Sequence, residues 1–300
     1  MDETHIKDVQ DREDRENEDG VVIDLEYSER PADPGPYKIP LRSLEDLKAT
    51  SPSRKHGVSE EQEETWRRNC VDLIIKTGLK LQIDHLATLT ALEFLHRFYA
   101  EYSMATNDRF LMSMACLYLA GKVADSPKSS RDILLAGSSV LKRKKHGMDA
   151  HDKHWLDAAR KQLVRAERAL LYQTGFRFPN TSATGLVIPM LRDKKLYEFL
   201  KSTLKDDEKV SNFSQLCIHF TNQSAKIPLI LQYEPSVIAA ACIWMVMKIL
   251  KVPDAVLRVP EPWYVQHGAR NGDLQDISNQ LIDDLLRDAS RIDEKRSVTN

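Results

Sequence analysis

The sequence is short of glycine and cysteine, and these shortages exclude several classes of site. Its 11 glycines amount to roughly half of the average usage of about 7%. Neither glycine-rich phosphate-binding motif, G-x-G-x-x-G or G-x-x-x-x-G-K-[ST], occurs. The four cysteines are far apart and form no C-x-x-C pair: Cys70, Cys116, Cys217 and Cys242. A nucleotide-binding loop, a disulfide framework and a zinc ribbon are therefore disfavoured, and a reducing compartment is expected.

Long apolar runs and an excess of one charge are also missing. The most apolar stretch, residues 237–250, contains Lys248 and is shorter than the ~20 residues that a membrane-spanning helix needs. The amino terminus is acidic and has no apolar segment of the kind that secretory signals carry. The net charge is −2, which gives no strong general attraction to nucleic acid or anionic lipid. We therefore expect no membrane partner and no direct nucleic-acid contact.

The charge that is present is distributed unevenly along the chain. The first 50 residues carry 15 Asp and Glu against 7 Lys and Arg, a net charge of −8, so the remaining 250 carry +6. Five of the 13 prolines also fall between residues 31 and 52. High charge and proline with few large apolar residues are typical of disorder. Residues 1–54 are predicted to be a disordered, acidic and proline-rich tail.

The rest of the chain has the pattern of an all-helical protein. The sequence contains no proline between Pro52 and Pro127, or between Pro127 and Pro179, and an interior proline costs a helix about 3 kcal/mol. Helix-start residues recur in the first half, at Ser59, Asp84, Asn107 and Ser129, and a further long helix is expected over 151–174. Five helices are expected in the second half, over 184–204, 207–226, 235–251, 261–268 and 273–290. No strand-like alternation separates them.

The two halves also share a short repeat. Ala115-Cys116 is followed by Lys122 and Pro127, and 126 residues later Ala241-Cys242 is followed by Lys248 and Pro253. Each set belongs to an apolar helix that ends at a lysine and a proline. We interpret the chain as two tandem five-helix domains, residues 55–178 and 179–292, each built around one buried helix.

Two charged residues in the first half lie at apolar positions. Lys122 follows Leu111, Met114 and Tyr118 on one helical face, and Glu167 lies on an apolar line of the long helix over 151–174. A charge on an apolar face needs a partner or a route to the surface. The sequence leaves two interpretations open: a polar pair at a recognition surface, or an internal Lys–Glu bridge or two solvated ends.

Several segments resemble a known family. ACLYLAGKVADSPKSSRDIL (115–134), HRFY (96–99) and ERALLYQTGFRF (167–178) resemble the core of the cyclin box, and LQYEPSVIAAACIWMVMKILK (231–251) resembles the matching helix of a second box. The similarity is greatest to transcriptional cyclins of the T and K type, and SPSR (51–54) is similar to plant T-type cyclins.

The resemblance implies a function as well as two tandem cyclin boxes. Members of this family are non-catalytic subunits that bind and activate a cyclin-dependent kinase as a heterodimer. In the T and K branch that kinase phosphorylates the C-terminal repeats of RNA polymerase II, so a nuclear protein without a cofactor is expected.

The resemblance also implies which residues contact the kinase. Lys122 and Glu167 match the family's kinase-binding Lys and Glu, Tyr118 and Phe176 match aromatic contact positions, and Asp125 matches the second acidic residue of a K-x-E-E motif. Here that motif reads KVAD over residues 122–125, so one carboxylate is lost and the other is shortened. Because of this departure, the sequence leaves open how tightly the chain binds a kinase and which kinase it binds.

Three other interpretations remain. A cyclin-fold scaffold without kinase binding would explain the altered K-x-E-E motif. A DNA-binding protein like the B-type general transcription factor has the same fold, but that family carries a zinc ribbon that this chain lacks. An enzyme is disfavoured: His151-x-x-His154 forms no obvious complete set of metal ligands and is interpreted as a pair of solvated loop histidines, so no metal is expected.

One basic run has two open interpretations. Lys142, Arg143, Lys144 and Lys145 are consecutive. They form either a nuclear import signal or a solvated loop between helices.

Overall fold

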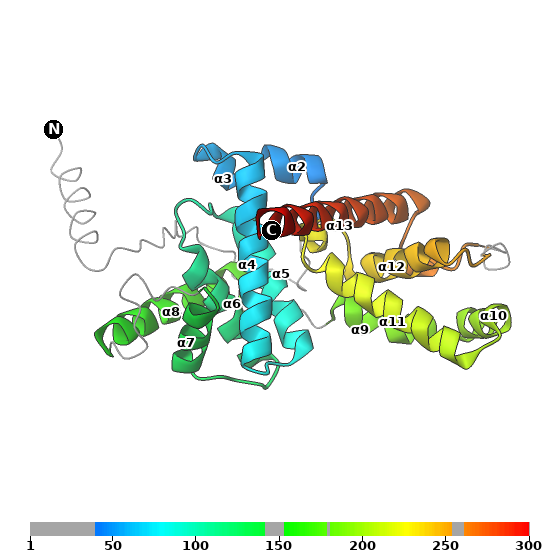
Figure 1. Ribbon diagram of the computed structural model, residues 1–300, viewed down its shortest axis with the longest axis horizontal. Coiled ribbons are helices and arrows are strands. Elements are labelled where there is room, and N and C mark those ends of the chain that lie inside the picture. Colours follow the sequence, from blue (N-terminus) through cyan, green and yellow to red (C-terminus); the bar gives the residue numbers. More distant parts are fainter. Residues whose placement is uncertain (1–39, 142–152, 179–180, 254–260, 300) are drawn as a thin grey trace. The chain divides into compact units, whose positions relative to one another are not determined.

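The computed structural model describes residues 40–141, 153–178, 181–253 and 261–299, and all regular structure in these ranges is helical (Figure 1). This confirms the predicted all-α class. The chain divides into two compact units, one of Ser43–Phe178 and one of Pro40–Arg42 together with the residues from Pro179 onward. In the described part of the chain, no helix is long and apolar enough to cross a bilayer.

In its described residues, the first unit has two short helices followed by five longer ones, which Figure 1 labels. They are α2 (Leu44–Ala49), α3 (Pro52–Lys55), α4 (Glu60–Lys80), α5 (His85–Glu101), α6 (Arg109–Val123), α7 (Ser130–Val140) and α8 (Lys153–Thr174). Helix α6 is central, because it packs against α4, α5, α7 and α8 and every residue from Phe110 to Leu117 is buried. This explains why the helix is apolar nearly all round.

Local capping determines where these helices begin. The side chains of Ser59, Asp84 and Ser129 accept backbone N–H groups at the starts of α4, α5 and α7, as predicted. Helix α6 begins one residue later than predicted, because Asp108 accepts the N–H of Leu111 at 2.8 Å. Asn107 is buried and its side-chain amide instead donates to the Ser103 carbonyl.

The structure differs from the expected tail between residues 43 and 54, where α2 and α3 are helical. Ser43 caps α2 by accepting the N–H of Asp46 at 3.0 Å. Pro52 occupies the first position of α3, where its missing N–H removes no hydrogen bond. The prediction that the disordered tail extends to residue 54, which rested on proline-rich composition, is therefore wrong for residues 43–54, because α2 and α3 lie there. Residues 1–39 lie outside the described residues.

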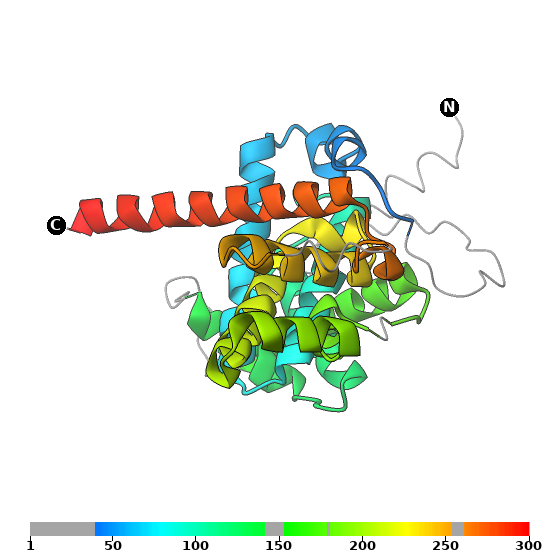
Figure 2. The same cartoon turned by 90° about the vertical axis from the view of Figure 1, so that its right-hand side faces the viewer.

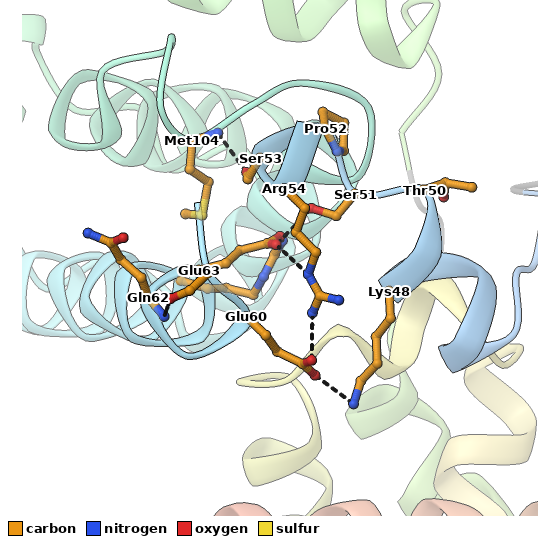
Figure 3. A network of polar contacts seen from close by, with 12 residues as sticks. Lys48, Thr50, Ser51, Pro52, Ser53, Arg54, Glu60, Gln62, Glu63 and Met104 are labelled. Carbon is orange, nitrogen blue, oxygen red and sulfur yellow. Dashed lines mark hydrogen bonds and ion pairs between the residues drawn. The ribbon is translucent and has the colours of Figure 1, made fainter. Parts of the chain in front are cut away.

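A buried carboxylate attaches this amino-terminal segment to α4 (Figure 3). Glu63 is 8% exposed. It accepts hydrogen bonds from the Ser51 hydroxyl at 2.7 Å and from the Arg67 guanidinium at 3.1 Å. The Arg54 guanidinium approaches the same carboxylate at 3.8 Å. Ser51 and Arg54 belong to the SPSR segment, so this sequence acts as a polar clamp on α4.

Two further contacts extend the clamp (Figure 3). The backbone N–H of Met104 donates to the Ser53 hydroxyl at 3.0 Å, and Ser53 is fully buried. On the exposed side, Glu60 forms ion pairs with Lys48 at 2.7 Å and Arg54 at 3.1 Å. The buried contacts contribute more to stability, because exposed ion pairs are worth only ~0–1 kcal/mol.

All regular structure in the described residues of the second unit is also helical. Its elements are α9 (Ala183–Leu191), α10 (Lys194–Leu204), α11 (Asp207–Ser224), the 3-10 helix η1 (Pro228–Leu231), α12 (Pro235–Ile249), the 3-10 helix η3 (Val265–His267) and α13 (Asn271–Thr299). Helix α12 packs against α9, α11 and α13 and takes the central place that α6 has in the first unit. Helix α13 runs as one long helix (Figure 2).

Two of the expected helix ranges in this unit need correction. The range 184–204 is two helices, because Asp193 accepts the N–H of Leu196 at 3.1 Å and so caps a new helix after Leu191. The range 261–268 forms only the short η3, which ends at Gly268 with φ +79°. Gly268 is in the left-handed region that glycine adopts at little cost.

The predicted repeat is structural as well as sequential. Ala115, Cys116, Ala241 and Cys242 are all fully buried in the central helices. The ammonium group of Lys122 lies 4.0 Å from the ring centroid of Tyr118, and that of Lys248 lies 5.2 Å from the ring centroid of Trp244.

The turns after the two central helices also correspond. Asp125 and Lys251 both have positive φ, +51° and +54°. The N–H of Ser126 donates to Gly121, and that of Val252 donates to Met247, both at 2.8 Å. All of these pairs are 126 residues apart, so α6 and α12, with the turns that follow them, are equivalent elements of two repeated units.

Candidate functional site

Lys122 and Glu167, which are 45 positions apart, meet where the end of α6 packs against α8. The Lys122 ammonium lies 2.6 Å from Glu167 Oε1. The Lys122 side chain is 41% exposed and that of Glu167 is 10% exposed. The structure therefore forms the direct bridge that the sequence left open, but places its basic end at the surface, where a second molecule can reach it.

Tyr118 lies under the lysine of this pair. It is one helical turn before Lys122, is half-buried, and presents its ring face 4.0 Å from the ammonium. Partial burial acts to lower the pKa of Lys122, but the hydrogen bond and the charge of Glu167, with Tyr118 adding to them, outweigh it. The pKa of Lys122 is raised, so the side chain is a cation at neutral pH and binds as a donor.

Asp125 lies in the turn after α6. Its N–H donates to the Lys122 carbonyl at 3.3 Å, and its side chain is exposed. The turn therefore displays a carboxylate three residues from the lysine.

Phe176 lies just after α8 and has φ +58°. Its side chain is 61% exposed and packs edge-on against Tyr172 with ring centroids 6.0 Å apart. Of the predicted contact residues, Lys122 contacts both Glu167 and Tyr118, and Phe176 contacts Tyr172 instead.

The positive φ of Asp125 and Phe176 does not by itself mark a site. Gln82, Lys205 and Lys251 have the same conformation, each just after a helix. A left-handed residue after the last turn is a common way to end a helix. The positive φ of Asp125 and Phe176 therefore indicates only that a helix ends there. Their exposed side chains are the reason to consider them as contact residues.

Two exposed apolar side chains of α8 were not predicted as contacts. Val164 is 47% exposed and Tyr172 is 40% exposed, whereas Leu170 is fully buried. Val164 lies one turn before Glu167 on the apolar line of the helix. The sequence pattern therefore predicts a core residue at this position. With Phe176 they add exposed apolar area to the α8 side of the Lys122–Glu167 pair.

The remaining sequence candidates give no second site. Lys142, Arg143, Lys144 and Lys145 lie outside the described residues, as does His151. No group of three His, Cys, Asp or Glu side chains that could hold a metal occurs in the part of the chain that the structure describes. The four cysteines are free and buried. Burial raises the pKa of each thiol, which makes them unreactive.

Gly121 allows the turn that carries Asp125. A methyl group added at Gly121 would lie 3.0 Å from the Ser126 carbonyl oxygen. We expect Gly121→Ala to destabilise the first unit by about 1–3 kcal/mol, although alanine is favoured over glycine in helices by ~1 kcal/mol. Urea unfolding measures the change. Gly272→Ala in α13, where the same methyl group meets no atom within 4 Å, should be neutral or slightly stabilising; a loss of similar size in both variants would contradict the role of the close contact.

Comparison with known proteins identifies the first unit. Residues 41–178 match the family described as cyclin, N-terminal domain. The first unit is therefore similar to a cyclin N-terminal domain. This confirms the resemblance inferred from the sequence, and the pair formed by Lys122 and Glu167 lies within the matched region.

Similar proteins extend the likeness beyond residues 41–178. Cyclin-T1-5 of Arabidopsis thaliana is 25% identical over 79% of this chain and 39% of its own length. Human cyclin-K is 28% identical over 68% of this chain and 32% of its own length. The chain thus spans less than half of the curated relatives it matches.

A solved structure supports the same fold. A chain in the crystal structure of the yeast RNA Pol II CTD kinase CTDK-1 complex superposes with a TM-score of 0.61 at 17% identity. The match covers 80% of this chain and 72% of that chain. At this identity the likeness shows a shared fold alone.

Proposed function

We propose that this chain is the regulatory subunit of a cyclin-dependent protein kinase that acts on the C-terminal repeats of RNA polymerase II. The observation that carries the proposal is the surface pair of Lys122 and Glu167, inside the region that matches a cyclin N-terminal domain. The likeness to T- and K-type cyclins supports the transcriptional branch. In this proposal the chain is not itself an enzyme.

The pair has unused hydrogen-bonding capacity. A lysine ammonium has three N–H donors, and Glu167 Oε1 accepts one of them. The exposed side of Lys122 can donate to backbone carbonyls of a partner, while the second carboxylate oxygen of Glu167 can accept a backbone N–H. Tyr118, Val164 and Phe176 supply the apolar contact around these polar bonds, and Asp125 supplies a further acceptor.

Activation follows from selective binding. A rigid helical surface that binds one kinase conformation more tightly than another shifts the population toward that conformation by the difference in affinity. In a protein kinase the active conformation seats the helix whose Glu pairs with the ATP-binding Lys. The chain would therefore contribute binding energy and no reacting group.

The proposal also places the protein in the nucleus, where RNA polymerase II works. The basic residues Lys142–Lys145 are the candidate import signal. Replacing these four residues with alanine in a fluorescently tagged chain tests that assignment separately from kinase binding.

Co-purification with a kinase assay tests the function. The tagged full-length chain is isolated from its native cells, the bound proteins are identified by mass spectrometry, and the complex is assayed on synthetic RNA polymerase II repeat peptides. We expect one cyclin-dependent kinase in near-equal amount and phosphorylation of the peptides. Recovery of the chain without a kinase would instead favour the cyclin-fold scaffold.

A further inference from the structure

Helix α8 displays three basic side chains in one line. Lys161, Arg165 and Arg168 follow each other at spacings of four and three residues, which places them on the same face of the helix. All three are exposed. We call them the α8 basic stripe.

The stripe lacks a counter-charge within the described part of the chain. None of its three side chains forms an ion pair or hydrogen bond there. Arg160, which lies outside the stripe, is paired with Asp157 at 3.9 Å and donates to the Ser130 hydroxyl at 3.2 Å. Like charges one turn apart on a helix destabilise it. A row of three unpaired cations therefore favours an anionic partner.

The chain itself supplies an anion of suitable length. Residues 1–20 contain 9 Asp and Glu against 3 Lys and Arg, a net charge of −6. The covalent path from residue 20 to Pro40, where the described residues begin, can extend to at most ~70 Å. A unit of this size has a radius of gyration of only about 14 Å. The acidic segment can therefore reach any exposed face of the first unit.

Tethering makes even a weak contact effective. A segment joined to its binding site by a short flexible connection has an effective concentration on the order of millimolar. Separate polyanions such as nucleic acid would compete for the stripe at concentrations far below millimolar. The chain's net charge of −2 also gives them no general attraction. The charge complementarity thus favours the chain's own segment as the occupant.

We propose that the acidic residues 1–20 dock on the α8 basic stripe of the same chain. The stripe borders the candidate site, since Arg168 is adjacent to Glu167 and one turn before Tyr172 on α8. The docking does not depend on the proposed function.

Paramagnetic NMR on the full-length chain tests the docking without any kinase. A Gln10→Cys variant is labelled with a nitroxide, and the four native cysteines do not compete because all are buried. We expect amide signals of α8 to broaden at ~50 mM salt and to recover at ~1 M, where the screening length falls to about 3 Å. Broadening of other surfaces without α8 would overturn the proposal.

Charge variants assign the contact. Lys161→Glu, Arg165→Glu and Arg168→Glu together should reduce the α8 broadening at least about threefold, because the local Coulomb attraction becomes repulsion. Lys194→Glu, Lys205→Glu and Lys209→Glu make the same change of charge on exposed residues of the second unit and should leave it intact. Equal effects of the two variants would refute a specific site.

A second variant leaves α8 unchanged. Replacing the acidic residues between Asp11 and Asp19 with their amides should also abolish the broadening. It should allow a short DNA duplex to bind the stripe more tightly than it binds the wild-type chain. Equal duplex affinity in the two chains would show that residues 1–20 do not occupy the stripe.

Discussion

Replacing Lys122 and Glu167 together with alanine is expected to weaken kinase binding at least about 30-fold. Central, well-packed polar contacts of an interface cost ~2 kcal/mol or more when truncated, and 1.4 kcal/mol corresponds to a factor of ten in Kd. The pair is partly buried and already joined at 2.6 Å, so it is pre-organised for a partner. The Kd of the purified complex, measured by titration calorimetry, gives the change, and activity on the repeat peptides should fall with it.

The repeat in the structure provides the matched control. Lys248 is the counterpart of Lys122 in the second unit and lies above Trp244 as Lys122 lies above Tyr118. Lys248→Ala should leave the Kd within about twofold of the wild-type value. Unchanged binding in the Lys122→Ala, Glu167→Ala variant would reject this site, even if a kinase still co-purifies. A double-mutant cycle with the single variants separates the coupling of the pair from the loss of each residue.

Glu63→Ala is expected to destabilise the first unit by about 3 kcal/mol. Removing one member of a buried ion pair typically costs ~3–5 kcal/mol, because the other charge remains buried without its partner. Arg67 would lose its bond to the Glu63 carboxylate while its side chain stays 14% exposed, and Ser51 would lose its acceptor. The low end of the range applies because both side chains keep some solvent contact. Hydrogen exchange of the α4 amides in increasing urea measures the change in the first unit alone.

Two variants show whether the carboxylate is the cause. Glu61→Ala removes an exposed carboxylate from the same first turn of α4 and should change stability by less than about 0.5 kcal/mol. Glu63→Gln keeps an acceptor for Ser51 and should fall between the two. A loss in Glu61→Ala as large as that in Glu63→Ala would mean that the turn, and not the buried network, carries the effect.

Sequence patterns located the elements best where the determining contact is local. Ser59, Asp84 and Ser129 cap their helices as predicted, since each acts on backbone groups two or three residues away. The buried central helices α6 and α12 were recognisable because they are apolar on every side. The errors have local causes as well. Asp193 begins a new helix inside the range 184–204, which was expected to be one helix. Ser43 and Pro52 begin helices inside a segment whose composition suggests disorder.

The candidate site was only partly accessible to sequence reasoning. Lys122 and Glu167 stood out as charges at apolar positions, and the resemblance to cyclins paired them. Their 2.6 Å contact and the greater exposure of the lysine depend on how α6 packs against α8. Val164 looked like a core residue, yet it is 47% exposed, because the buried face of α8 is turned away from it.

The amino-acid sequence alone determined the all-helical class, the repeat of two apolar central helices and the acidic character of the first 50 residues, because periodicity, capping and charge act over a few neighbouring positions. Only the tertiary structure decided which charges meet, which remain at the surface and which, like Glu63, are buried in a network. These outcomes depend on the packing of helices that are distant in the chain, and a residue's own neighbours in sequence do not specify that packing.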